Sequence, residues 1–277
     1  MVFIIADIGT NHLGDVSVVK QIIDIAVKAG CDAVKFEKKD VEQIYTKKFL
    51  DSFLDSPWGT TQREMRLHLE FNDKQYGEID LHCKKNKIPW FVSCWDVDNQ
   101  IHMKKFKTKY NQVDSTVLTH QRLLETIAKE KKLTFISTGI NIMKEISDAV
   151  KIFRDYKCPF ELMHSHGFFP MQLNETNIRL IPVLQKKFKC DVGYIGYEKV
   201  AYLACVIAAK LGATSIERHV TIDRTFYGND QAASLEPLGL QKMVRDTRLV
   251  EKILGDGKKR IWDSEIPTMK KLRQIFA

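Results

Sequence analysis

Short apolar, β-branched runs alternate with longer amphipathic segments along almost the whole chain. In residues 17–29, for example, apolar side chains recur every three or four positions, which is typical of a helix that packs on one face. Gly30 and Gly212 each follow such a segment and precede an apolar run, so they are expected to end helices. Strands are expected at 2–8, 33–37, 90–95, 110–115, 133–138, 160–166, 192–197 and 215–221. Helices are expected at 17–29, 72–87, 99–105, 121–129, 143–155, 175–187, 200–211 and 238–254.

Eight successive strand-then-helix units in a chain of 277 residues match the count and size of a (β/α)8 TIM barrel. We therefore expect an α/β fold that forms a single domain over residues 1–277. An open doubly wound sheet is the rival fold, but it usually carries a G-x-G-x-x-G turn after its first strand, and here the sequence is DIGTNHLG. Residues 39–66 are expected to form a long irregular insertion, and a loop of that length is often functional.

Composition and charge narrow the class of protein. The longest apolar runs are far shorter than the roughly 20 residues of a membrane span, and MVFIIADIG lacks the features of a signal peptide. We therefore expect a cytoplasmic protein with no membrane partner. The net charge is +8, but the lysines are scattered, which argues against a nucleic-acid partner and suits an anionic small substrate. None of the six cysteines forms a C-x-x-C pair, so no structural zinc site is expected.

Residue types suited to chemistry gather at the predicted strand ends, where the active sites of barrels lie. Asp7 ends the first strand and Lys35 lies in the second, while Ser93, Ser115 and Ser137 belong to the next three strands. Hydroxyls around a lysine suit a phosphate or a carboxylate, although any one serine could equally close its strand as a turn former. A lysine in an apolar strand is costly to bury unless it is paired, which favours a functional role for Lys35.

Two predicted strands carry histidines near their carboxyl ends. Glu217 and His219 share one face of the last strand by alternation, and together they suit metal binding or acid–base chemistry. His164 and His166 share a face of the sixth strand in the same way. They are either two metal ligands or a core histidine beside a surface one, and the spacing alone leaves both interpretations open.

Several long motifs occur in an order that resembles the sialic acid synthase family. They are IIADIGTNHLGD, DAVKFEKKD, RLHLEF, FISTGI, SIERHVTIDRTFYGNDQAASLEP and LGDGKKR. This family, which includes legionaminic and pseudaminic acid synthases, condenses phosphoenolpyruvate with an amino-sugar aldehyde such as N-acetylmannosamine. The products are a nonulosonic acid and phosphate. The resemblance therefore implies a transferase with a (β/α)8 catalytic barrel and a divalent metal, Mn²⁺ or Mg²⁺, and it also allows a homo-oligomer.

The resemblance implies roles for individual residues. Glu217 and Asp7 would be catalytic, although Asp7 stands where the family usually has a glutamate, and His219 would be a metal ligand. The substrate-binding residues that it implies are Lys35, Ser93, Ser115, Ser137, Asn177, Asp230 and Ser234.

The chain also departs from the family pattern. Gln112 replaces a second lysine, Tyr197 replaces the other metal histidine, Ile195 replaces a serine, and Glu37 replaces a glutamine. Many members carry an added C-terminal antifreeze-like domain, and we expect none in residues 1–277. Two interpretations stay open: a working synthase with a rearranged site, or a degenerate, non-catalytic member that keeps the fold as a binding or assembly protein. Within the first interpretation, we hypothesise that His166 is a metal ligand that partly replaces the missing histidine; the alternative is a coincidental substitution.

Overall fold

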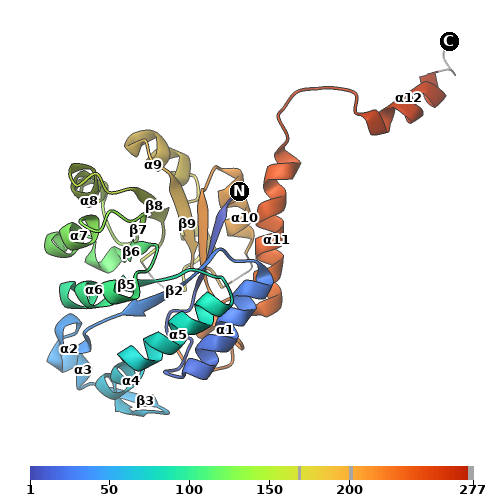
Figure 1. Ribbon diagram of the computed structural model, residues 1–277. Helices are drawn as coiled ribbons and strands as arrows, with labels where there is room; N and C mark the ends of the chain where they lie inside the picture. The colour runs from blue at the N-terminus through green and yellow to red at the C-terminus, as the bar shows by residue number, and fades with distance from the viewer. Residues whose placement is uncertain (168–169, 200–201, 274–277) are drawn as a thin grey trace.

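A computed structural model describes residues 1–167, 170–199 and 202–273, and Figure 1 shows helices surrounding a central barrel of strands. The parallel strands close into a barrel in the order β1-β10-β9-β8-β7-β6-β5-β2, which confirms the (β/α)8 fold. The barrel strands are β1 (Phe3–Asp7), β2 (Ala33–Lys38), β5 (Trp90–Cys94), β6 (Asn111–Val113), β7 (Thr134–Ser137), β8 (Phe160–His164), β9 (Val192–Gly196) and β10 (Ser215–His219).

Each of the eight predicted strands is present, and most are shorter than expected by one or two residues at an end. The fourth strand, β6, shows the physical reason. Asp114 accepts a hydrogen bond from the backbone N–H of Thr116 at 2.8 Å, so the chain turns into a 3₁₀ helix instead of continuing the strand. Ser115, expected at the strand end, therefore begins this 3₁₀ helix.

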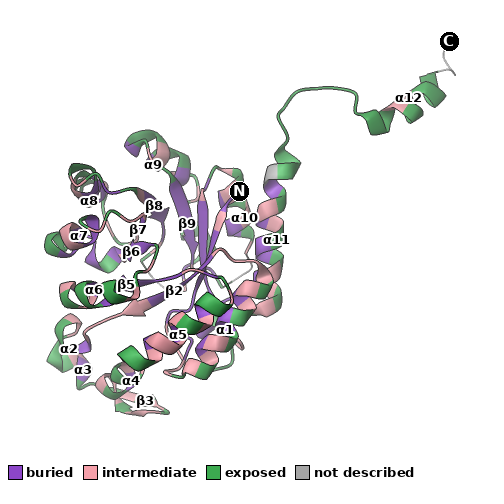
Figure 2. Ribbon diagram, in the orientation of Figure 1, coloured by how far each residue is buried: buried purple, intermediate pink, exposed green. Residues whose placement is uncertain are grey.

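The helices pack on the outside of the barrel with their apolar faces inward, and Figure 2 shows buried positions on the barrel side and exposed positions on the outer side. Gly30 ends the first helix with φ +85° and donates to the carbonyls of Ala26 and Val27, as its position predicts. The outer helices are α1 (Val16–Ala29), α5 (Asp73–Lys85), α6 (Val97–Met103), α7 (Gln121–Ala128), α8 (Met143–Asp155), α9 (Leu180–Phe188), α10 (Leu203–Lys210) and α11 (Pro237–Leu254). Short 3₁₀ helices are η1 (Lys104–Phe106), η2 (Ser115–Val117), η3 (Leu173–Glu175), η4 (Gln231–Ala233) and η5 (Asp263–Glu265).

Side chains fill the inside of the barrel in layers. An apolar layer consists of Ile5, Ala33, Phe91, Tyr110, Phe135, Met163 and Ile195, each at most 8% exposed. Because side chains alternate along a strand, the residues two positions further on point inward at the next level. That level is polar, and it includes Asp7, Lys35, Ser93, Gln112, Ser137 and Tyr197. The fold therefore places a polar chamber on an apolar floor at the carboxyl ends of the strands.

The segment 39–66, expected to be irregular, is largely ordered into short elements. It contains α2 (Val41–Ile44), α3 (Lys47–Leu50), the antiparallel pair β3 (Phe53–Ser56) and β4 (Gly59–Thr61), and the start of α4 (Gln62–His68). Two contacts hold the hairpin in place: the distant Tyr227 donates its hydroxyl to the carbonyl of Asp55 at 2.9 Å, and Trp58 stacks on His68 of α4 with centroids 4.7 Å apart. The irregular prediction was wrong because the contact between Tyr227 and Asp55 joins segments 172 residues apart in the sequence.

After α11 the chain leaves the barrel and runs to a last short helix, α12 (Ile266–Arg273), which projects away from the other helices in Figure 1. No helix in the described part of the chain is long and apolar enough to span a membrane.

Candidate active site at the strand ends

One lysine and two carboxylates form a buried cluster at the top of the barrel. Strand β1 lies between β2 and β10, so Asp7 is level with Lys35 on one side and with His219 on the other. Lys35 Nζ donates to Asp7 Oδ2 at 2.7 Å and to Glu217 Oε1 at 2.9 Å. All three side chains of this cluster are at most 2% exposed. Lys35 is therefore a buried cation whose desolvation is offset by two carboxyl partners.

The protonation of this cluster suits proton transfer. Burial raises the pKa of Glu217, Lys35 lowers it and Asp7 raises it, and the resulting pKa is about 7. Burial alone would lower the pKa of Lys35, but the carboxylates of Asp7 and Glu217 outweigh it and hold that pKa well above its usual value. Near neutral pH, Lys35 is therefore charged and Glu217 is present in both protonation states. A carboxyl group poised in this way can act as a general acid or base.

Gln112 connects the cluster to the neighbouring hydroxyls. Its Nε2 donates to Glu217 Oε1 at 3.3 Å and to Ser137 Oγ at 3.4 Å, while Ser93 Oγ donates to the Gln112 backbone carbonyl at 3.5 Å. Gln112 Oε1 and Glu217 Oε2 are buried and have no hydrogen-bond partner among the described residues. Because a buried acceptor without a donor is costly, these two oxygens are ready to accept hydrogen bonds from a ligand.

His219 borders the cluster on the β10 side. Its Nδ1 lies 3.4 Å from Asp7 Oδ2, and the ring of Tyr197 stacks on it with centroids 5.8 Å apart. A side chain at Gly9, where φ is +49°, would place its Cβ only 2.6 Å from His219 Cε1, so this close approach requires glycine. Burial raises the pKa of Tyr197 well above its usual value, and its phenol is therefore uncharged at neutral pH.

These residues do not form a complete site for a divalent metal. His219 Nδ1 and Asp7 Oδ2 are two candidate donors, but the same Asp7 oxygen already accepts from Lys35. Tyr197, a neutral phenol, stands where the resemblance implies a second histidine. In the part of the chain that the structure describes, no three His, Cys, Asp or Glu side chains gather closely enough to hold a metal ion.

His166 lies just beyond the end of β8. Its Nε2 is 3.7 Å from Glu175 Oε2. His164, two residues earlier, contacts the Thr176 carbonyl at 2.8 Å through Nε2 and packs beside the ring of Tyr194, which belongs to the core between barrel and helices. These contacts favour the structural interpretation of His164. The role of His166 as a replacement metal ligand stays a prediction, and its contact with Glu175 gives it no support.

Two predicted substrate-binding residues lie apart from the cluster. Ser115 packs against Gly139 so closely that a Cβ there would be 2.4 Å from Ser115 Oγ, and its carbonyl accepts from Asn141 Nδ2 at 2.7 Å. Asn177 is exposed, with φ +38°, between η3 and α9. Ser115 is buried close to the carboxyl end of β6, whereas the binding role predicted for Asn177 has no contact to support it among the described hydrogen bonds.

The loop after β10 is tied to the loop after β1. Asp230 Oδ2 accepts from the backbone N–H and the hydroxyl of Thr10, at 3.1 and 2.5 Å, and Asn11 Nδ2 donates to Ser234 Oγ at 2.8 Å. Asp230 Oδ2 also lies 3.0 Å from where a Gly9 Cβ would be, next to His219. The structure thus brings Asp230 and Ser234 to the β1 side of the chamber.

A second lysine stands above the chamber, and the sequence analysis missed it. Lys39 Nζ lies 2.7 Å from Glu37 Oε2 and 3.8 Å from the centroid of the Trp95 ring. Burial raises the pKa of Glu37, but Lys39 and Lys35 lower it more strongly, and the resulting pKa is about 2. The alternation of residues 35, 37 and 39 on one strand face was a usable signal. It was overlooked because residue 39 was assigned to an irregular insertion.

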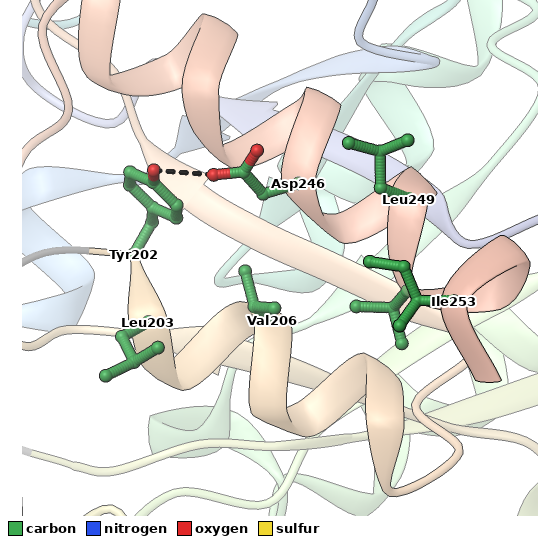
Figure 3. A pocket seen from close by; sticks show the side chains of 7 residues that line it. Tyr202, Leu203, Val206, Asp246, Leu249 and Ile253 are labelled. Atoms are coloured by element: carbon green, nitrogen blue, oxygen red, sulfur yellow. Dashed lines mark hydrogen bonds between the residues drawn. The ribbon is translucent and has the colours of Figure 1, made fainter.

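An apolar groove lies elsewhere, on the outer helices (Figure 3). Tyr202 donates its hydroxyl to Asp246 Oδ2 at 2.7 Å at one end of the groove. The lining comes from α10, the residue before it and α11: Tyr202, Leu203, Val206, Asp246, Leu249, Val250 and Ile253. None of these residues belongs to the strand ends, so the polar chamber remains the candidate active site.

Comparison with known proteins finds similarity along the whole barrel. A sequence model of the NeuB family matches residues 22–259. N-acetylneuraminate-9-phosphate synthase from Homo sapiens is 34% identical over 273 residues, which cover 98% of this chain and 76% of the relative. N,N'-diacetyllegionaminic acid synthase from Campylobacter jejuni subsp. jejuni is 31% identical over 268 residues, which cover 95% of this chain and 80% of the relative. One solved structure is similar over nearly the whole chain: the crystal structure of N-acetylneuraminic acid (sialic acid) synthetase from Leptospira borgpetersenii serovar Hardjo-bovis in complex with citrate. It superposes with a TM-score of 0.85 at 31% sequence identity, and the match covers 99% of this chain and 93% of that chain.

Proposed function

The chain belongs to the NeuB family, and from this membership we propose that it condenses phosphoenolpyruvate with the aldehyde of an open-chain amino sugar. The products are a nonulosonic acid of the sialic type and inorganic phosphate. The observation that carries the proposal is Lys35, a buried cation held between Asp7 and Glu217 in a chamber lined with hydroxyls. The non-catalytic alternative has no observation in its favour.

The reaction forms one carbon–carbon bond and one carbon–oxygen bond, from water to C2, and it breaks the C2–O bond to phosphate. C3 of phosphoenolpyruvate attacks the aldehyde carbon, the aldehyde oxygen takes up a proton, water adds to C2, and phosphate leaves from C2. Lys35 would bind an anionic oxygen of phosphoenolpyruvate, with Ser93 and Ser137 as neighbouring hydrogen-bonding groups. Glu217, with a pKa about 7, would move the protons: it can donate to the aldehyde oxygen and accept from the water that adds.

Two finer points belong to this proposal. The relatives' names include a 9-phosphate product and a diacetylated one, so both phosphorylated and unphosphorylated amino-sugar aldehydes are candidate substrates. A requirement for Mn²⁺ or Mg²⁺ stays a prediction of the family resemblance, because the described residues supply an incomplete donor set. Addition of a chelator, followed by each metal in turn, tests that requirement.

Phosphate release tests the proposed function directly. The purified chain is incubated with phosphoenolpyruvate and each of several aldehydes, including N-acetylmannosamine and its 6-phosphate, with and without Mn²⁺. We expect phosphate release that depends on one aldehyde. The product should have the combined mass of phosphoenolpyruvate, that aldehyde and water, less the mass of the released phosphate. Lys35→Met should abolish it, whereas Lys20→Met, which changes an exposed pair with Glu78, should not. Absence of aldehyde-dependent phosphate release with every aldehyde would reject the synthase assignment.

A further inference from the structure

The charges in the chamber leave an anionic substrate short of positive partners. Lys35, the cation of the buried cluster, already bonds two carboxyl groups, Asp7 and Glu217. Phosphoenolpyruvate carries a phosphate and a carboxylate, and an amino sugar with a terminal phosphate would add another anionic group. Bringing such groups into a buried chamber is costly unless further cations or strong donors meet them.

Lys39 is positioned to be such a cation. It follows Lys35 and Glu37 in steps of two along the strand direction, so it continues the inward-facing row toward the mouth of the barrel. The preceding residue, Lys38, points the other way: its Nζ donates to Glu70 Oε2 at 2.8 Å and to the Phe71 carbonyl at 3.0 Å. The two adjacent lysines therefore serve different sides of the strand.

The Lys39 side chain is held in place by several contacts. Its ammonium bonds Glu37 at 2.7 Å and lies 3.8 Å from the centroid of the Trp95 ring, a cation–π distance. Its backbone N–H donates to the carboxylate of Glu70 at 3.2 Å. The side chain is 13% exposed, so it is mostly enclosed but still reachable from the mouth. An ammonium has three N–H donors, and the described contacts of Lys39 use one of them in a hydrogen bond.

We propose that Lys39 binds an anionic oxygen group, a phosphate or a carboxylate, of a substrate bound at the mouth of the barrel. This inference rests on the proposed function, because it takes the substrates to be anionic. Glu37 keeps the ammonium charged and aimed when the chamber is empty, and one or both free N–H groups then bind the substrate. The anionic group belongs either to phosphoenolpyruvate or to the terminal phosphate of the sugar, and kinetics can distinguish these two sources.

Lys39→Met is the test variant and Lys38→Met is the matched control, since Lys38 has a similar exposed fraction of 14%. KM and kcat are measured for phosphoenolpyruvate, for an amino-sugar aldehyde and for the same aldehyde with a terminal phosphate. We expect Lys39→Met to raise KM at least about tenfold for one anionic substrate, with a smaller change in kcat. A rise for phosphoenolpyruvate identifies it as the ligand, and a rise for the phosphorylated aldehyde alone identifies the sugar phosphate.

Lys39→Arg keeps the charge and should stay within about threefold of the wild-type KM. Unchanged KM values in Lys39→Met, or equal losses in Lys39→Arg or Lys38→Met, would overturn the inference. If the wild-type chain releases no phosphate, the proposed function fails, and Lys39 is then tested by calorimetric binding of phosphoenolpyruvate and of the sugar phosphate. Equal dissociation constants of wild type and Lys39→Met for both ligands would overturn the inference independently of turnover.

Discussion

Replacement of Lys35 by Met should destabilise the barrel by an amount that increases with pH. In the wild-type chain the Lys35 ammonium contacts Asp7 at 2.7 Å and Glu217 at 2.9 Å, and all three side chains are at most 2% exposed. Methionine has nearly the same length, so the change removes the charge and leaves little cavity. It also leaves two neighbouring carboxyl groups buried without a cation.

The magnitude follows from the burial of the pair. Removal of one partner of a buried ion pair typically costs about 3–5 kcal/mol, and we expect this loss near pH 8. The pKa of Glu217 is about 7 with Lys35 present and should rise further without it. A carboxyl group whose pKa is raised in the folded state destabilises the fold at high pH, because it must then carry its charge in a buried place. Each unit by which the folded-state pKa exceeds the unfolded one lowers the free energy of unfolding at high pH by about 1.4 kcal/mol. The deficit should therefore shrink to roughly 1–2 kcal/mol near pH 5, where the fold takes up protons.

Urea and thermal unfolding followed by tryptophan fluorescence at several pH values would measure this loss. At about 2–4 °C per kcal/mol, Lys35→Met should melt roughly 6–20 °C below wild type at the higher pH. Lys20→Met is the control, because its pair with Glu78 is 37% and 43% exposed and should contribute no more than about 1 kcal/mol at any of these pH values. Equal losses in the two variants, or a Lys35→Met loss that does not change with pH, would refute a buried ionic cluster.

Three further variants test the chamber. Glu217→Gln should lower kcat for phosphate release by about 100-fold or more and flatten the pH–rate profile around the pKa of about 7; an unchanged profile would contradict its role in proton transfer. Gly139→Ala would put a methyl group 2.4 Å from Ser115 Oγ, so it should displace that hydroxyl and raise KM for phosphoenolpyruvate by about tenfold. Gly77→Ala is the control: its methyl group meets only open space, and KM should stay unchanged. Tyr197→His adds an imidazole next to the one already present and should tighten Mn²⁺ binding in calorimetry by about tenfold; no gain would show that this position does not face the metal.

The barrel could be predicted because its signals are local. The strands are short apolar runs, and the helices carry apolar residues along one face. Glycines mark helix ends, as at Gly30 and Gly212, both of which have positive φ. The hairpin of β3 and β4 could not be predicted in this way. Its strands have four and three residues, and its position depends on Tyr227, which is 172 residues from its partner Asp55 in the sequence.

The candidate site could be predicted in part, by the rule that barrel active sites lie at strand ends. That rule selected Asp7, Lys35 and Glu217, which the structure joins by hydrogen bonds. It could not show that one lysine bonds both carboxylates, because that depends on the closure of β1 between β2 and β10. Lys39 was missed because residue 39, one position beyond the observed end of β2, was assigned to an irregular insertion.

The filled lower half of the barrel has a consequence for kinetics. Aromatic and aliphatic side chains such as Phe91 and Phe135, at most 1% exposed, occupy the space beneath the chamber, so reactants and products exchange with solvent through the upper mouth. A molecule bound at Lys35 lies deeper than one bound at Lys39, and a ligand at the mouth would block its path. Substrate addition should therefore be ordered, with the deeper ligand first, and initial-rate patterns with a dead-end analogue of the second substrate would reveal that order.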